Sequence, residues 1–367
     1  MLFILMVGAG LRAEVREMLM HALRIPETVL EYVEEVGDLK LPEGFTQPKA
    51  VVFAGMGGSA ISGDVVRCWL RDVSPVPLET VRGYHLPAYV GPGTLVVAVS
   101  YSGQTEETIS AFSEAVDRGC MTVSVSSGGI LRELSESLGV PWIAVPRGLQ
   151  PRAAFPQLLT AETAVLEAVG VPGARLGELV EACRELLPLV PRVEAEARRV
   201  ADGLFGRLPV VYSHEGLWPA ALRFKTQLNE NSKVPAKVEF LPELCHNEVV
   251  GLEGPGELLS GMAVVLLRDP GEEPPIRERV EAVKELLDGR VGAVLEFWAP
   301  GSSRIARLLS AVLFGDVVSV YLASMYGVDP TEVRSISLIK QRLKKLGVVG
   351  RVFERLTGRT LSESPPS

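Results

Sequence analysis

Residues 50–60 read AVVFAGMGGSA, an apolar strand-like run that turns into a glycine-rich loop and then into helix-like sequence. The same pattern returns at residues 95–105, where LVVAV is followed by SYSGQT. A strand that turns tightly into a helix presents backbone N–H groups and the positive end of the helix dipole beyond its carboxyl end. Glycines admit a close approach and hydroxyls add donors, so both loops predict a site for an anion such as a phosphate monoester. The predicted phosphate ligands are Gly57, Gly58, Ser59, Ser100, Ser102 and Thr105.

The first loop also fits the dinucleotide-binding pattern G-x-G-x-x-[GA], with Glu79 about 20 residues on, where a ribose-binding acid is expected. The second loop favours a smaller ligand. Hydroxyls at Ser100, Ser102 and Thr105 suit one phosphate held by two neighbouring strand-to-helix turns better than a pyrophosphate lying on the first helix. A sugar phosphate is therefore the preferred ligand, and a dinucleotide is the alternative.

Composition limits the class of protein. A chain of 367 residues, 47% of them hydrophobic and 22% charged, is typical of a globular protein of two domains. The net charge of −8 argues against nucleic acid as a partner. We expect no membrane partner, because apolar runs are shorter than the ~18–20 residues of a span. Residues 1–10 lack a basic segment and a cleavage site, so we predict no signal peptide and a cytoplasmic protein.

Strand-like and helix-like segments alternate along most of the chain, which predicts an α/β fold with mainly parallel sheets flanked by helices. The predicted strands of the first half are 50–54, 76–81, 95–99, 120–125 and 141–145, with helices near 59–71, 105–118 and 129–138. Those of the second half are 209–213, 237–241, 263–267 and 291–297, with helices near 216–230, 244–250, 275–288 and 303–326.

The two halves thus predict one architecture used twice. The predicted divisions are an N-terminal helical segment 1–48, a first domain 49–155, a helical linker 156–205, a second domain 206–327, and a C-terminal helix and tail 328–367. The second half has Ser213-His214-Glu215-Gly216 where the first has its glycine-rich loop. We expect no phosphate there, and hence one active site built by both halves.

Glu230 is the candidate base, because it lies between Asn229 and Asn231 at the end of a predicted helix, and the chain contains one further asparagine only. His246 is the candidate acid–base group, since a neutral pKa suits proton transfer to hydroxyls. His214, at a strand end, is its rival. An exposed Glu and a helix-capping His are the plainer interpretations of the same residues.

Arg152 is held between prolines just before a helix, where a fixed guanidinium suits an oxyanion or a structural ion pair. Lys340 lies on an amphipathic helix. The four histidines and four cysteines show no metal-ligand spacing, so we predict neither a metal nor another cofactor.

Five motifs in this order resemble one family: G-M-G-G-S, S-Y-S-G-x-T-x-E-T, P-R-A-A-x-P, N-E-N and H-N-E. They are similar to those of the archaeal bifunctional phosphoglucose/phosphomannose isomerases, which belong to the phosphoglucose isomerase superfamily and consist of two sugar-isomerase (SIS) domains. The resemblance covers nearly the whole chain. It implies a doubly wound fold for each domain and a homodimer.

Carried over motif by motif, the resemblance implies roles for the candidate residues. The two loops would hold the substrate phosphate, and Glu230 would be the base. His246, expected from the partner subunit, and Lys340 would serve ring opening, with Arg152 against the reacting carbons. The implied reaction interconverts glucose 6-phosphate and mannose 6-phosphate with fructose 6-phosphate through a cis-enediol.

Other functions stay open at this point. SIS domains also serve in non-catalytic regulators that bind sugar phosphates, although such proteins usually add a DNA-binding motif and a basic face. An isomerase of glucose 6-phosphate alone fits the same motifs. An isomerase of a pentose or amino sugar phosphate typically needs one SIS domain only or an added glutaminase domain.

Overall fold

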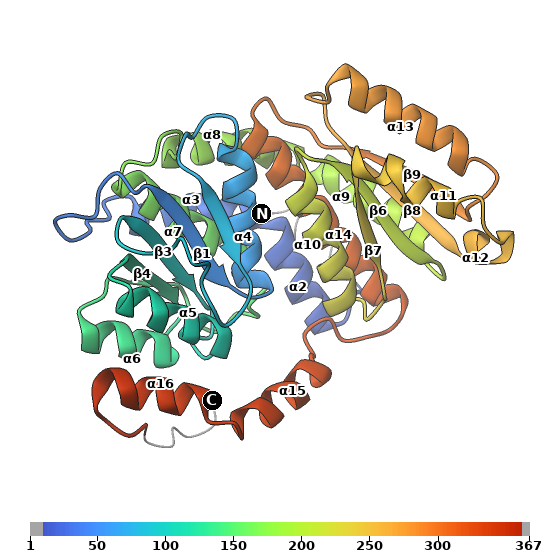
Figure 1. The fold of residues 1–367 in the computed structure, drawn as a ribbon. Helices are drawn as coiled ribbons and strands as arrows, with labels where there is room; N and C mark the ends of the chain where they lie inside the picture. Colours follow the sequence, from blue (N-terminus) through green and yellow to red (C-terminus); the bar gives the residue numbers. More distant parts are fainter. Residues whose placement is uncertain (1–9, 362–367) are drawn as a thin grey trace. The chain divides into compact units, whose positions relative to one another are not determined.

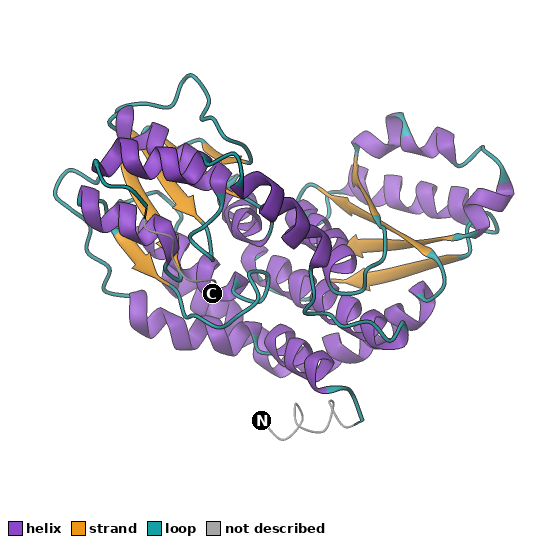
Figure 2. Cartoon of the chain, turned by 90° about the horizontal axis from the view of Figure 1, so that it is seen from below, coloured by secondary structure: helices purple, strands orange, loops and turns teal. Residues whose placement is uncertain are grey.

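The computed structural model describes residues 10–361 and divides them into two compact units (Figure 1). We name the units after their sheets. The N-sheet unit comprises residues 31–176 and 333–361, and the C-sheet unit comprises residues 10–30 and 177–332. In both units, helices cover the two faces of the strands (Figure 2). The predicted fold class is thereby confirmed, whereas residues 1–9 and the Ser-Pro-Pro-Ser end of the predicted tail lie outside the described residues.

The N-sheet unit contains a five-stranded parallel sheet in the order β2-β1-β3-β4-β5. Its strands are β1 (Ala50–Gly55), β2 (Leu78–Val81), β3 (Thr94–Val99), β4 (Met121–Ser126) and β5 (Trp142–Ala144). The central pair aligns Val51 with Leu95, and both residues are fully buried. Continuous apolar runs rather than alternating ones are what a sheet covered on both faces requires.

The helices of this unit follow the strands. They are α4 (Gly58–Leu70), α5 (Glu106–Asp117), α6 (Gly129–Leu138), α7 (Phe155–Ala168), α15 (Arg334–Lys344) and α16 (Val348–Thr357). Helix α4 packs against α7, while α16 packs against α5 and α6. Helix α16 lies in the segment after Lys340 that was predicted to be a tail, and its Phe353 is buried with Phe112 and Leu131 in one hydrophobic cluster.

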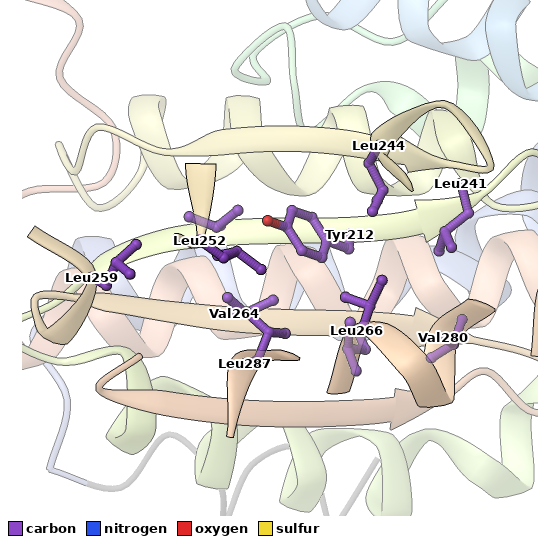
Figure 3. Close-up of a cluster of buried hydrophobic side chains, with 11 residues drawn as sticks. Tyr212, Leu241, Leu244, Leu252, Leu259, Val264, Leu266, Val280 and Leu287 are labelled. Atoms are coloured by element: carbon purple, nitrogen blue, oxygen red, sulfur yellow. The ribbon is translucent and has the colours of Figure 1, made fainter. Parts of the chain in front are cut away.

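The C-sheet unit contains a four-stranded parallel sheet in the order β7-β6-β8-β9. Its strands are β6 (Leu208–His214), β7 (Lys237–Leu241), β8 (Met262–Arg268) and β9 (Ala293–Trp298). Figure 3 shows the cluster over one face of this sheet, where Tyr212, Val264 and Leu266 meet Leu244 and Leu287 from the flanking segments.

The helices here are α2 (Ala13–Leu23), α8 (Leu176–Leu186), η1 (Leu187–Leu189), α9 (Val190–Leu204), α10 (Trp218–Glu230), η2 (Glu243–His246), α11 (Glu248–Gly251), α12 (Gly256–Ser260), α13 (Pro274–Leu287) and α14 (Arg304–Met325). A further helix, α3 (Ile25–Val36), crosses the division between the units. The single helix predicted near 244–250 is wrong. Asn247 separates η2 from α11, because its side-chain oxygen caps α11 by accepting from the N–H of Glu248 at 2.6 Å.

Helix α14 is the core of the C-sheet unit and packs against α2, α9 and α10. It is long and apolar enough to cross a membrane, with a mean hydropathy of 1.8, so the expectation that no run reaches that length was wrong. However, 89% of its apolar window is buried inside the structure. A helix that is apolar on all sides is equally what the centre of a protein core requires.

Candidate active site

The two predicted phosphate loops lie at the same edge of the N-sheet. The chain leaves β1 for β2 on one side and later returns to β3 on the other side, so the strand order reverses between β1 and β3. Loops after the carboxyl ends of two such strands diverge and open a crevice, which is where open α/β sheets bind their ligands. The loops that follow β1 and β3 here are residues 56–57 and 100–105.

The first loop turns at Gly57, whose φ of 51° lies in the left-handed region that favours glycine. A Cβ placed on Gly57 meets nothing within 4 Å, so the space beside this residue is open. The next residues begin α4. The Oγ of Ser59 accepts a hydrogen bond of 3.1 Å from the N–H of Tyr101, which joins the first loop to the second.

The second loop places its hydroxyls around Gly103. Ser100 is fully buried, and its Oγ lies 2.9 Å from Oγ1 of Thr105, the residue before α5. The Oγ of Ser102 accepts from the N–H of Gln104 at 3.2 Å. All six predicted phosphate ligands therefore come from two hydrogen-bonded loops at one sheet edge.

Arg152 lies against the first loop. A Cβ on Gly58 would come within 3.2 Å of the Cα of Arg152 and of the carbonyl oxygen of Pro151, so the two backbones touch at Gly58. Arg152 is 2% exposed and lies three residues before the start of α7. The N-sheet unit thus brings the backbone of Arg152 to the first predicted phosphate loop, while the role of Arg152 beside the reacting carbons stays a prediction.

A buried carboxyl group, missed in the sequence analysis, links the helices that follow these loops. Glu162 on α7 is fully buried, and its Oε1 accepts a hydrogen bond of 2.8 Å from the Oγ of Ser62 on α4. Burial raises the pKa of Glu162 well above its usual range, and the nearby negative charge of Asp64 adds to the rise. Asp64 itself is buried and ion-paired with Arg82. A neutral Glu162 is thus the form that this packing favours.

Glu230 is the last residue of α10 and is half-buried. The side-chain amides of Asn229 and Asn231, on either side of it, are hydrogen-bonded within the fold. Nδ2 of Asn229 donates to the carbonyl oxygen of Val234 at 2.8 Å, and Nδ2 of Asn231 donates to Oγ of Ser319 at 2.9 Å. Both bonds fix the backbone that carries the Glu230 carboxylate.

His246 ends η2 after β7, an edge strand of the C-sheet, and its side chain is exposed. The H-N-E motif is anchored by its other two members. Asn247 donates to Oε1 of Glu243 at 2.8 Å, and Glu248 accepts from the hydroxyl of Tyr212 at 2.9 Å. Hence His246 projects from a segment that is tied to the sheet.

The rival histidine, His214, is enclosed at the switch point of the C-sheet. It is 8% exposed, its Nδ1 accepts from the N–H of Gly216 at 3.1 Å, and its Nε2 lies 3.1 Å from Oδ2 of Asp269. Since Nδ1 is an acceptor, the network assigns the proton to Nε2, which donates to Asp269. Both ring nitrogens are therefore occupied within the fold.

Asp269 directly follows β8, which lies beside β6 as β3 lies beside β1. It therefore occupies the position in the C-sheet unit that the second phosphate loop has in the N-sheet unit. Besides His214, its carboxylate accepts from the N–H of Gly271 and lies 3.4 Å from Nε of Arg307. Burial by itself raises the pKa of Asp269, but the hydrogen bond from His214 and the charge of Arg307 outweigh it and lower the pKa overall. The second switch point thus holds an internal anion.

Lys340 is exposed on α15, a helix in which no residue is buried. Within residues 10–361, no hydrogen bond or ion pair joins Lys340 to the phosphate loops. The same described residues contain no group of three or more His, Cys, Asp or Glu side chains that could hold a metal ion.

Comparisons with known proteins extend this description. A family model described as the bacterial phospho-glucose isomerase C-terminal SIS domain matches residues 193–343, and the SIS domain model matches residues 44–130. The C-terminal domain of glucosamine-fructose-6-phosphate aminotransferase from Francisella tularensis has the same fold, with a TM-score of 0.68 and 15% identity over 88% of this chain and 99% of that one. At this identity the likeness concerns the fold alone.

Two relatives are more similar in sequence. A bifunctional phosphoglucose/phosphomannose isomerase from Caldicellulosiruptor bescii is 38% identical over 304 residues, which cover 81% of this chain and 90% of the relative. A D-glucosamine-6-phosphate 4-epimerase from Sulfolobus acidocaldarius is 31% identical over 317 residues, covering 86% and 96%. The first relative is bacterial, so the narrower expectation of an archaeal branch is not confirmed. From its identity of 38% over 81% of its length, the chain belongs to the family of the bifunctional phosphoglucose/phosphomannose isomerases.

Proposed function

We propose that this protein interconverts glucose 6-phosphate and mannose 6-phosphate with fructose 6-phosphate. The single observation that carries the proposal is the pair of hydroxyl-bearing loops at the switch point of the N-sheet, in a chain that is 38% identical to an isomerase of both aldoses. The substrate phosphate binds to these loops, at Gly57, Gly58, Ser59, Ser100, Ser102 and Thr105.

The reaction needs one base and one electrostatic partner. Glu230 takes the proton from C2 of the open-chain aldose, and the C–H electron pair forms the C1=C2 bond of a cis-enediolate whose charge lies on O1. Glu230 then returns the proton to C1 while the O2 proton passes to O1, which leaves a carbonyl group at C2 and gives the ketose. Because glucose and mannose 6-phosphates differ only at C2, both pass through this intermediate. Arg152 stabilises the enediolate charge, a contribution of about 3–4 kcal/mol for a preorganised donor.

Ring opening precedes this step and moves a proton between O5 and O1. We assign it to His246 with Lys340, since a neutral imidazole exchanges protons with hydroxyls near pH 7. His246 is exposed at the edge of its own sheet, and we propose that it serves the active site of a partner subunit in a homodimer. The enzyme would act in the cytoplasm, in glycolysis and gluconeogenesis, and would need no metal.

The test is to incubate EDTA-treated protein with fructose 6-phosphate in D2O and to follow it by proton NMR. We expect glucose and mannose 6-phosphates, both deuterated at C2. Glu230→Gln should lower kcat by about 10²–10⁴-fold, the usual contribution of a general base, while Glu285→Gln, an exposed carboxylate on α13, should match the wild type.

Other outcomes separate the alternatives. Glucose 6-phosphate alone would leave the mechanism and remove the second activity. Saturable binding without turnover would indicate a sugar-phosphate-binding regulator. Conversion of glucosamine 6-phosphate at C4, with fructose 6-phosphate unchanged, would overturn the proposal in favour of the epimerase activity that the Sulfolobus relative is named for.

A further inference from the structure

The C-terminal end of α10, where Glu230 lies, is hydrogen-bonded to α14 through the two residues that follow Glu230. Ser319 on α14 is fully buried, and its Oγ accepts the hydrogen bond from Nδ2 of Asn231 at 2.9 Å. The same Oγ donates to the carbonyl oxygen of Asp316 at 2.6 Å, which fixes the rotamer of the serine. The carbonyl oxygen of Ser319 in turn accepts from Oγ of Ser232 at 2.7 Å.

These bonds hold a part of the helix that would otherwise be loose. The last carbonyls of a helix lack partners within the helix, and its final turn frays easily. Here the two residues after Glu230 are both buried, Asn231 at 0% and Ser232 at 1% exposure, and both bond to Ser319 on the buried helix α14. The backbone of Glu230 therefore cannot shift without breaking hydrogen bonds inside the core.

A second contact lies two turns earlier on the same pair of helices. Nε and Nη2 of Arg223 donate to the two carboxylate oxygens of Asp316 at 2.9 and 2.7 Å. This buried bidentate pair holds α10 against α14, but Arg223 lies seven residues before Glu230 in the helix. Next to the proposed base, Asn229 bonds to the carbonyl oxygen of Val234, and Lys233 donates to the carbonyl oxygen of Glu230 at 2.6 Å. The bonds to Ser319 are those that join this end of α10 to α14.

We propose that Ser319 is a positioning residue for the base Glu230, acting through Asn231 and Ser232. The inference rests on the proposed isomerase function. A base that is misplaced by a fraction of an ångström from the C2 proton slows proton transfer, whereas substrate held by other groups still binds. Loss of the Ser319 hydroxyl should thus lower kcat and leave KM nearly unchanged.

The experiment compares Ser319→Ala with Ser310→Ala. Ser310 lies on the same helix, is equally buried, and its Oγ bonds to two backbone carbonyl oxygens, of Pro300 at 2.8 Å and of Arg307 at 2.9 Å. We expect Ser319→Ala to lower kcat about 10–100-fold with KM within about twofold, and Ser310→Ala to change both by less than about twofold. Thermal unfolding should show a similar loss of stability in both variants.

Two further measurements separate positioning from general damage. With glucose 6-phosphate deuterated at C2, the primary isotope effect on kcat should increase in Ser319→Ala and not in Ser310→Ala, because only the former slows proton transfer. Ser319→Thr, which keeps the hydroxyl, should restore most of kcat. If Ser319→Ala does not fold, Ser232→Ala removes a bond on the same side of Glu230 and should give the same split between kcat and KM.

Equal effects of Ser319→Ala and Ser310→Ala on kcat would overturn the inference, provided that the wild type is active. An unaltered isotope effect in Ser319→Ala would do the same. A wild-type protein without isomerase activity would instead refute the proposed function, so the two failures are distinguishable.

Discussion

A single buried group, Glu162, makes the stability of the fold depend on pH. Its folded-state pKa lies above the unfolded value, because burial disfavours the carboxylate and Asp64 adds negative charge. The folded protein then binds more protons than the unfolded one above about pH 4.3, the ordinary pKa of Glu. The contribution of Glu162 to the free energy of unfolding is fully present below that pH. It is lost as the pH rises toward the folded-state pKa.

Glu162→Gln should therefore be increasingly favourable as the pH rises. The amide keeps the shape of the acid and an acceptor for Ser62, and it never ionises. We expect the two proteins to have similar melting temperatures near pH 4 and the variant to melt at a higher temperature at pH 7–8. Glu133→Gln, an exposed position on α6, is the control. Parallel melting curves over the whole pH range would contradict this account.

At the residue scale, motifs located the candidate ligands but not what holds them. The spacing of Ser100 and Thr105 predicts that one loop brings their hydroxyls together, and the two oxygens lie 2.9 Å apart. The hydrogen-bond partners of Asn231 and His214 could not be predicted from the sequence, since Ser319 and Asp269 follow 88 and 55 residues later in the chain. Only the packing of α10 on α14 and the order of the strands bring these pairs together.

At the scale of elements, the loop after β3 depends on close backbone contact. Gly103 has a φ of +64°, and a Cβ there would lie 1.8 Å from the carbonyl oxygen of Gly128, in the loop after β4. Gly119 has nearly the same φ, +66°, but a Cβ there meets nothing within 4 Å. The two glycines thus have nearly the same backbone conformation, but only Gly103 lies in close contact with another loop.

Replacing each by alanine separates these causes. Gly119→Ala should cost about 1–2 kcal/mol of stability, the penalty of an L-residue in the left-handed region, with KM unchanged. Gly103→Ala should cost at least about 3 kcal/mol, because the loops must also move apart. It should raise KM for fructose 6-phosphate about tenfold as Ser102 and Thr105 shift. Chemical denaturation and steady-state kinetics measure both effects, and equal losses in the two variants would rule out the contact.

Elements with strong periodic patterns were predicted to within a few residues. The strands predicted at 50–54 and 95–99 are found at Ala50–Gly55 and Thr94–Val99, because apolar runs bounded by glycine or polar residues leave little choice. Short and terminal elements were missed. The capping role of Asn247 divides a helix, and α16 becomes a helix by burying Phe353 against α5 and α6, which local sequence does not reveal.

At the scale of the molecule, the chain does not fold as consecutive blocks. Residues 10–30 join the unit of residues 177–332, and Arg12 donates to the carbonyl oxygen of Val328 at 2.6 Å across 316 positions. Residues 333–361 return to the unit that begins at residue 31. Two repeated βαβ patterns predict two sheets, but no local pattern predicts which terminal helix packs on which sheet.

The proposed homodimer makes a prediction that only a whole assembly can test. If His246 serves the partner's site, a subunit with Glu230→Gln and a subunit with His246→Ala together form one site with both groups intact and one with neither. Dissociation and random reassociation of the two inactive variants yields half mixed dimers, and hence about a quarter of wild-type activity in a symmetric dimer. Activity, assayed with fructose 6-phosphate, should appear with the kinetics of subunit exchange.

The control is a mixture of Glu230→Gln with Glu230→Ala subunits, which carry their lesions at one residue and cannot form an intact site. It should stay inactive through the same treatment. If His246 instead serves its own chain, each site of a Glu230→Gln and His246→Ala dimer keeps one lesion, and mixing restores nothing. Recovery of a quarter of the activity, set against none in the control, therefore decides whether the catalytic unit is the subunit or the dimer.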